Sequence, residues 1–184
     1  LDTDLKHLGI IHDHFGALSL ALASYTPIVY LDSWMSKRAI EHNLEQNQIH
    51  NDITFETQLE QLSTQLSNSS IVIGKIPKQN SQLIALLQIL RHALKPGTIL
   101  LLAGMDKHLS RSQYDLLAKH FGPSEFLPGV KKARIWKAYC KPDLATDQTD
   151  ATQRTLNSFW GKEIALPTYQ LKLRALPQVL SRDK

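Results

Sequence analysis

The chain has 184 residues, of which 42% are hydrophobic and 21% are charged, as expected for one globular domain with a small extension. Its single cysteine, Cys140, excludes an intrachain disulfide and a multi-cysteine metal site, and fits a reducing compartment such as the cytoplasm. The longest apolar runs fall far below the ~18 residues that a membrane span requires. Because the first residue is Leu1 rather than Met, we expect the chain to be part of a longer protein.

Charge is distributed unevenly along the chain. Residues 1–70 carry nine acidic and three basic side chains, whereas residues 71–184 carry eight acidic and 18 basic ones. An imbalance of this kind favours a basic face that meets a polyanion, but a solvated surface of uneven charge produces the same counts. From charge alone, nucleic-acid binding therefore remains one of two interpretations.

Strands and helices are predicted to alternate through the first two thirds of the chain. Short apolar runs predict buried strands over residues 8–12, 28–31, 53–55, 70–74 and 98–103. Apolar side chains at helical spacing predict helices over residues 15–23, 34–48, 57–66, 81–94 and 110–121. This alternation is typical of an α/β fold with a doubly wound, mostly parallel sheet.

The sheet is expected to finish with two strands that have no helix between them. Residues 131–139 alternate apolar and basic side chains, which predicts a strand paired with residues 125–130. This pair would form an antiparallel edge. The predicted organisation is a first domain over residues 1–141, a polar linker over 142–155, and short strands (156–160 and 168–175) within 156–184.

The first strand, turn, helix and second strand have the path of a nucleotide-binding βαβ unit. Asp32 ends the second strand, where an acid would take the hydroxyls of an adenosyl ribose. The turn DHFGAL holds only one glycine, Gly16, and Phe15 stands where a cofactor would approach the main chain. We therefore interpret Asp13, Phe15, Gly16 and Asp32 as a vestigial, closed pocket in which Asp13 caps the helix. The rival interpretation is a working cofactor pocket.

Basic residues follow the fourth strand, in the segment GKIPK. Adenosyl-dependent amino methyltransferases carry an Asn/Asp-Pro-Pro-aromatic loop at this point, which accepts hydrogen bonds from the target amine. Lys75 and Lys78 can contact phosphate but cannot accept a hydrogen bond. No catalytic residue is therefore predicted in this chain.

The eight histidines show no spacing typical of metal ligands, and the triplet His12-Asp13-His14 is interpreted as a solvated turn. No G-x-S-x-G motif is present, so a hydrolase triad has no support. We expect neither a metal site nor nucleophilic catalysis.

The segment KKARIWK, at residues 131–137, combines cations with an aromatic ring. Cations bind phosphates, and a tryptophan can stack on an unpaired base. The alternative is an edge strand that lysines protect against aggregation. The predicted RNA-binding residues are Lys75, Lys78, Lys131, Lys132, Arg134 and Trp136.

Several motifs resemble, in the same order, the N-terminal domain of bacterial ribosomal RNA guanine-N2 methyltransferases. They are IIHDHFGALSLALA, YLDSWMSKRAIEHNL, IVIGKIPK, LLAGMDKHLS and GVKKARIW. The likeness covers residues 8–184 and is closer to the large-subunit (23S) enzymes than to their small-subunit (16S) siblings. The D-x-F-G-A-L-S turn and the K-K-A-R strand are its most specific parts.

This resemblance implies two methyltransferase folds in tandem. The C-terminal copy would bind S-adenosylmethionine and catalyse, and LKLRALPQVLSRDK resembles the segment that leads into it. The N-terminal copy would be a degenerate, Rossmann-like duplicate without cofactor that helps to hold RNA. The implied partners are 23S ribosomal RNA and the chain's own catalytic domain, in the cytoplasm. Two alternatives stay open: a domain that itself binds S-adenosylmethionine, and a purely structural module.

Overall fold

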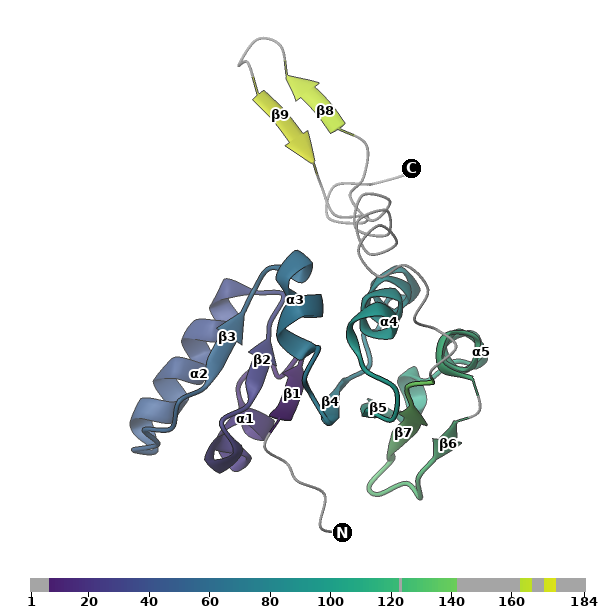
Figure 1. The fold of residues 1–184 in the computed structure, drawn as a ribbon, viewed down its shortest axis with the longest axis horizontal. Helices are drawn as coiled ribbons and strands as arrows, with labels where there is room; N and C mark the ends of the chain where they lie inside the picture. The colour runs from purple at the N-terminus through teal and green to yellow at the C-terminus, as the bar shows by residue number, and fades with distance from the viewer. Residues whose placement is uncertain (1–6, 123, 142–162, 167–170, 175–184) are drawn as a thin grey trace.

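The computed structural model describes residues 7–122, 124–141, 163–166 and 171–174 (Figure 1). The strands of its main sheet are β1 (Leu8–Ile11), β2 (Ile28–Tyr30), β3 (Thr54–Glu56), β4 (Ile71–Lys75), β5 (Ile99–Met105), β6 (Glu125–Phe126) and β7 (Ala133–Tyr139). The helices are α1 (Ala17–Ala21), α2 (Trp34–Gln46), α3 (Leu59–Leu66), α4 (Asn80–Ala93) and α5 (Arg111–Phe121), with 3₁₀ turns η2 (Ala23–Tyr25) and η3 (Asp106–His108).

The seven strands form one sheet in the order β3-β2-β1-β4-β5-β7-β6. Strands β1 to β5 are parallel, whereas β7 is antiparallel to β5 and β6 is antiparallel to β7. The predicted α/β fold, with a doubly wound, mostly parallel sheet and an antiparallel edge pair, is confirmed. The strand order reverses between β1 and β4, which is the position where ligands of such sheets bind.

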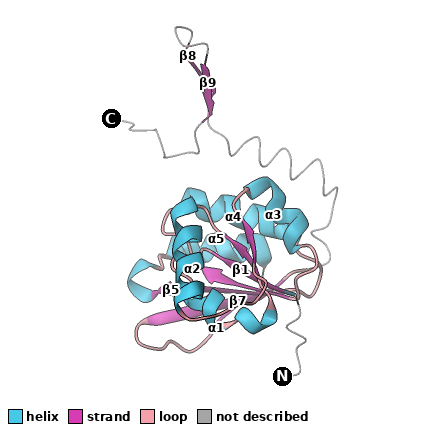
Figure 2. Ribbon diagram, turned by 90° about the vertical axis from the view of Figure 1, so that its left-hand side faces the viewer, coloured by secondary structure: helices cyan, strands magenta, loops and turns pink. Residues whose placement is uncertain are grey.

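Helices cover both faces of the sheet (Figure 2). On one face, α3, α4 and α5 bury a large core with side chains such as Leu62, Leu87 and Phe121. On the other face, a smaller core joins α2 to β1 and β2 through Ile40 and Leu44. Both faces of the central strands are therefore apolar, which explains why their sequences are continuous apolar runs.

The parallel strands end at one side of the sheet, which we call the carboxyl edge. It comprises the loops after β1, β2, β4 and β5, together with the loop that precedes the antiparallel β7. Strands β1 and β4 come close together here, since a Cβ atom on Gly74 would lie 2.7 Å from the Ile11 carbonyl oxygen. Glycine at this position lets the two strands pair up to their ends.

Several predicted elements differ in the structure. The strands expected over 125–130 and 131–139 are the shorter β6 and β7, and residues 131 and 132 lie in a turn before β7. The helix expected over 15–23 is a five-residue helix, α1, followed by the turn η2. The turn ends at Thr26, which has a left-handed φ of 47° and precedes Pro27, whose ring disfavours helical backbone before it. Near the end of the chain, β8 (Glu163–Leu166) and β9 (Leu171–Arg174) pair as a separate antiparallel hairpin. The strand predicted over 168–175 matches β9, β8 was not predicted, and the strand predicted over 156–160 lies outside the described residues.

A candidate nucleic-acid interface at the carboxyl edge

The first turn is held by a carboxylate that faces inward. Asp13 is only 8% exposed, and its Oδ2 accepts hydrogen bonds from the backbone N–H of Ser19 at 2.7 Å and from its hydroxyl at 2.8 Å. Gly16 has φ +93° and begins the helix. Asp13 therefore caps α1, and glycine suits the left-handed turn. A carboxylate engaged in this way is not available to a ligand.

The acid at the end of β2 also has a partner within the chain. The Asp32 carboxylate lies 3.6 Å from Nδ1 of His12. Both residues follow neighbouring parallel strands, and the His12 backbone donates to the Tyr30 carbonyl. The sequence interpretation of His12 as a solvated turn residue is wrong. The pairing of two adjacent strands, each ending in an ionisable residue, is the signal that would have revealed it.

This contact affects the ionisation of Asp32. The neighbouring His12 side chain holds the pKa of the Asp32 carboxyl below its ordinary value of 3.8, against the opposing effect of partial burial. Asp32 therefore contributes stability that is present above pH 3.8 and is lost as the pH falls through its lowered pKa. The side chain is 49% exposed, so solvent screening keeps this contribution small.

An open hollow of about 350 Å³ is lined by Asp13 and Phe15 of the predicted vestigial pocket, but not by Gly16 or Asp32. We call it the apolar hollow, because its lining is mostly apolar and includes Phe15, Leu18, Ala103 and Met105. Phe15 does not fill it: the residue is 74% exposed and borders the hollow. That Phe15 closes a cofactor pocket beside Asp32 stays a prediction, because Asp32 is not part of the lining of this hollow. The short α1 turns the ring outward and leaves space between α1 and the ends of β4, β5 and β7.

A second hollow, of about 230 Å³, lies beside the first. We call it the basic hollow, because Lys75, Lys78, Lys107 and His108 line it. In the described part of the chain, none of its three lysines forms an ion pair with a carboxylate. Sequence reasoning singled out Lys75 and Lys78 but missed Lys107 and His108, although both directly follow the carboxyl end of β5.

The lysines Lys131 and Lys132 form the tip of a two-residue β-turn. Val130 and Ala133 exchange backbone hydrogen bonds of 2.9 Å in both directions. Lys131 and Lys132 both have positive φ, of 49° and 66°, which defines the type I′ geometry that normally favours Asn-Gly. Two side chains with a Cβ atom are strained in this conformation. The tip also lies next to β5, since the Lys132 carbonyl accepts from the backbone of Asp106 at 2.8 Å.

Arg134 and Trp136, the predicted RNA-binding residues within β7, are less accessible to an RNA than the lysines of the turn. Arg134 binds Asp106 through Nε at 2.7 Å. Trp136 is fully buried, where it packs edge-on against Phe121 with ring centroids 5.8 Å apart. The prediction that Trp136 stacks on a base is therefore wrong. Alternation along β7 turns residue 136 toward α5 and the core, and its indole is part of that core rather than of the surface.

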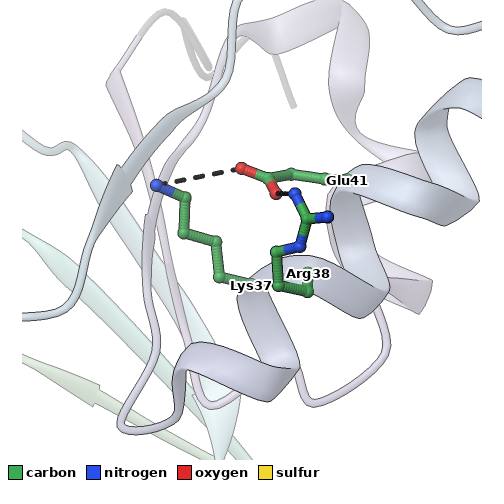
Figure 3. A network of polar contacts seen from close by, with 3 residues as sticks. All are labelled: Lys37, Arg38 and Glu41. Atoms are coloured by element: carbon green, nitrogen blue, oxygen red, sulfur yellow. Dashed lines mark hydrogen bonds and ion pairs between the residues drawn. The ribbon is translucent and has the colours of Figure 1, made fainter.

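Not every exposed cation of the chain is available for an anion. On α2, Lys37 and Arg38 both point toward Glu41 (Figure 3), at 3.8 Å and 3.4 Å. These contacts neutralise part of their charge within the chain. Lys75, Lys78, Lys107, Lys131 and Lys132 have no such carboxylate partner among the described residues, so the carboxyl edge concentrates unpaired positive charge.

The described residues meet the requirements of neither a metal site nor a membrane-spanning helix. Within the described residues, no group of three or more His, Cys, Asp or Glu side chains is arranged to hold a metal ion. In the same part of the chain, no helix has both the length and the apolar character needed to cross a bilayer.

Solved structures that superpose on this chain include methyltransferases with bound AdoMet or SAM. The 16S rRNA N2 methyltransferase RsmC of T. thermophilus, in complex with AdoMet and guanosine, superposes with a TM-score of 0.66 at 15% identity, over 97% of this chain and 44% of that one. Magnesium protoporphyrin IX methyltransferase (ChlM) from Synechocystis, with bound SAM, gives 0.53 at 17% identity, over 72% and 68%. The fold is thus that of the Rossmann-like methyltransferases.

The sequence comparison is more specific. A family model described as the RLMG N-terminal domain matches residues 2–143, and the chain belongs to that family. Ribosomal RNA large subunit methyltransferase G of Yersinia enterocolitica is 32% identical over 126 residues, which are 68% of this chain and 31% of the relative. The Vibrio cholerae protein of the same name is 32% identical over 131 residues, or 71% and 34%. The chain therefore spans about a third of the length of these relatives, and the resemblance predicted from its motifs is confirmed.

Proposed function

We propose that this chain is the RNA-binding, non-catalytic N-terminal part of an S-adenosylmethionine-dependent 23S rRNA guanine-N2 methyltransferase. The observation that carries the proposal is the strained Lys131-Lys132 turn at an edge rich in unpaired lysines. Strain of this kind persists where a function needs the residue type, because Asn-Gly would form the same turn at lower cost. The names of the relatives supply the class of RNA.

The residues at the carboxyl edge support the proposal of a non-catalytic role. Oδ2 of Asp13 is engaged by Ser19, and the half-exposed Asp32 has His12 as its neighbour at 3.6 Å, so both acids already have partners within the chain. After β4, Lys75 and Lys78 donate hydrogen bonds but cannot accept one from a guanine amine. A separate catalytic domain, the proposed partner of this chain, would bind S-adenosylmethionine and transfer the methyl group to a guanine exposed from its helix. We place the protein in the cytoplasm, and propose 1–141 as the domain and 142–155 as the linker.

Lysines at the carboxyl edge would bind the phosphates of the RNA backbone. Such contacts hold an RNA in register without reading its sequence. Because each neutralised phosphate releases counterions, binding should weaken steeply with salt. The arrangement therefore suits a domain that holds a ribosomal RNA substrate while its partner reaches the target base.

The first prediction concerns two pairs of lysines, Lys131→Ala/Lys132→Ala and Lys75→Ala/Lys78→Ala. Each double variant should weaken binding to a 23S rRNA fragment at least tenfold at low salt. Each should also reduce the slope of log affinity against log salt by about 1.4, since one single-strand phosphate contact contributes about 0.7. Filter binding or fluorescence anisotropy across a salt series measures both quantities.

The matched control is Lys95→Ala/Lys141→Ala. Lys95 precedes β5 and Lys141 follows the antiparallel β7, so both lie at the opposite edge of the sheet. This variant removes the same charge and should leave affinity and slope almost unchanged. If the three double variants behave alike, the carboxyl edge is not an RNA interface and the chain is a structural module.

One rival function is that this chain itself binds S-adenosylmethionine, with the half-exposed Asp32 at the end of β2 as the ribose acid. Isothermal titration calorimetry distinguishes the two. We expect no heat of binding with S-adenosylmethionine. Binding at micromolar concentration that is lost in Asp32→Ala would establish the rival and overturn the non-catalytic assignment.

A further inference from the structure

The two hollows at the carboxyl edge are continuous with each other. Both are lined by Lys75, Gly104 and Met105. One is mostly apolar and bordered by an exposed phenylalanine ring, and the other is lined by three lysines and a histidine. A site with a flat apolar half and an adjoining cationic half matches a nucleotide, which has an aromatic base and an anionic phosphate.

We infer that the apolar hollow binds one unpaired base of the RNA, stacked on Phe15, while the basic hollow holds its neighbouring phosphates through Lys75, Lys78 and Lys107. This inference rests on the proposed RNA-binding function and adds a defined site for a single-stranded nucleotide. The vestigial cofactor pocket has thus become part of the RNA interface.

Phe15 is the strongest support for the base site. Phe15 lines the apolar hollow and is also 74% exposed, so its ring is accessible to a base that enters the hollow. Its carbonyl accepts a hydrogen bond of 2.8 Å from the Asn43 side chain, which ties the turn to α2 and fixes the position from which the ring projects. A ring held in this way loses little freedom when a base stacks on it.

The surrounding residues favour a base over an adenosyl cofactor. An adenosyl ribose is recognised by an acid at the end of β2, whereas Asp32 lies beside His12 and is not part of the lining of the apolar hollow. Stacking needs no free acid, since every base has an aromatic face. The lysines of the basic hollow supply the phosphate contacts that a nucleotide within an RNA strand has and that S-adenosylmethionine lacks.

The volume of the apolar hollow also limits the size of the ligand that it can bind. At about 350 Å³ it lies near the lower limit of small-molecule sites, which run from roughly 300 to 1,000 Å³. One base fits this space, but a base pair within a helix would not enter it. The site is therefore specific for single-stranded or locally unpaired RNA.

The test uses the full 184-residue chain and single-stranded RNA that carries 2-aminopurine, whose fluorescence is quenched by stacking. The wild-type protein should quench it on binding. Phe15→Ala should abolish the quenching and weaken single-strand binding by about 5- to 150-fold, the effect of removing one stacking ring. Phe15→Tyr should restore both, because the ring is kept. Binding to a fully paired RNA duplex should be the same for all three proteins.

Two further variants separate the base site from general effects. Tyr25→Ala removes a half-exposed ring that precedes β2 at the opposite edge, and should change neither signal. Ala103→Leu places a larger side chain in the apolar hollow and leaves every lysine in place, and should reduce quenching as Phe15→Ala does. Circular dichroism confirms that each variant is folded.

The outcomes distinguish the inference from the function on which it rests. If Phe15→Ala binds and quenches like the wild type while Lys75→Ala/Lys78→Ala weakens binding, the base site is wrong but RNA binding stands. If neither variant affects RNA binding, the nucleotide site is wrong, and if Lys131→Ala/Lys132→Ala also has no effect, both proposals are wrong. Displacement of the RNA by excess S-adenosylmethionine would also overturn the base site, because the hollow would then be a cofactor pocket.

Discussion

At the scale of single residues, the acids that a cofactor would use have been given partners inside the chain. Asp13 accepts two hydrogen bonds from Ser19, and Asp32 pairs with His12. Both carboxylates are therefore retained, and they differ from the acids of a cofactor site in the side chains that contact them. Motif comparison alone does not detect this, because both aspartates are still present in the sequence.

The Asp13 cap leads to a prediction about stability. Asp13→Ala should lower the free energy of unfolding by about 2 kcal/mol, because it removes a helix cap and leaves the buried N–H and hydroxyl of Ser19 without their acceptor. Urea denaturation followed by circular dichroism measures the change. Asp52→Ala, in an exposed loop, is the control and should stay within about 0.5 kcal/mol of the wild type. Equal stability of the two variants would show that the cap is not stabilising.

At the scale of elements, the hairpin between β6 and β7 combines two demands that conflict. Its two-residue turn favours Asn-Gly, because both positions need positive φ. The chain instead has Lys131 and Lys132 there. A conflict between local backbone preference and residue choice is expected at functional sites. The alternative, that lysines merely protect an edge strand, does not require them at these strained positions.

This conflict predicts a trade-off between stability and binding. Lys131→Asn/Lys132→Gly should raise the free energy of unfolding by about 1–2 kcal/mol, because the strain of two left-handed residues is relieved. The same variant should bind RNA as weakly as Lys131→Ala/Lys132→Ala, which keeps the strain and should gain no stability. Thermal denaturation and fluorescence anisotropy test the two effects separately. A variant that gains stability and keeps full RNA affinity would show that the lysines are not RNA contacts.

At the scale of the whole molecule, the main sheet holds both cores. The seven strands and five α-helices of residues 7–141 enclose the large cluster on one face and the smaller one on the other. The hairpin β8–β9 pairs only within itself among the described strands. An isolated two-stranded hairpin is at best marginally stable in water. The stability of the chain should therefore come from the part that precedes residue 142.

A truncation tests this division. A chain that ends at Lys141 should unfold cooperatively in urea, with a free energy of unfolding within about 1 kcal/mol of the full chain, since both buried cores remain. It should also keep its RNA affinity, because the carboxyl edge is intact. Loss of cooperative unfolding on truncation would show that residues 142–184 complete the core and that the proposed domain boundary is wrong.

The sequence by itself determined the α/β class, the antiparallel edge pair, the family and the positions of most elements. These follow from local properties: apolar runs define buried strands, helical spacing defines helices, and motif order identifies relatives. The same local reasoning predicted the Asp13 cap and the turn at Gly16, because both act within a few residues of chain.

Only the tertiary structure decided which side chains meet and which face outward. The pairing of His12 with Asp32 depends on two strands lying side by side, and the basic hollow depends on loops some thirty residues apart meeting at one edge. The burial of Trp136 depends on which face of β7 packs against α5, and the exposure of Phe15 on how far α1 extends. These are properties of packing between distant segments, and the local patterns along the chain do not fix them until the strand order and the packed face of each strand are known.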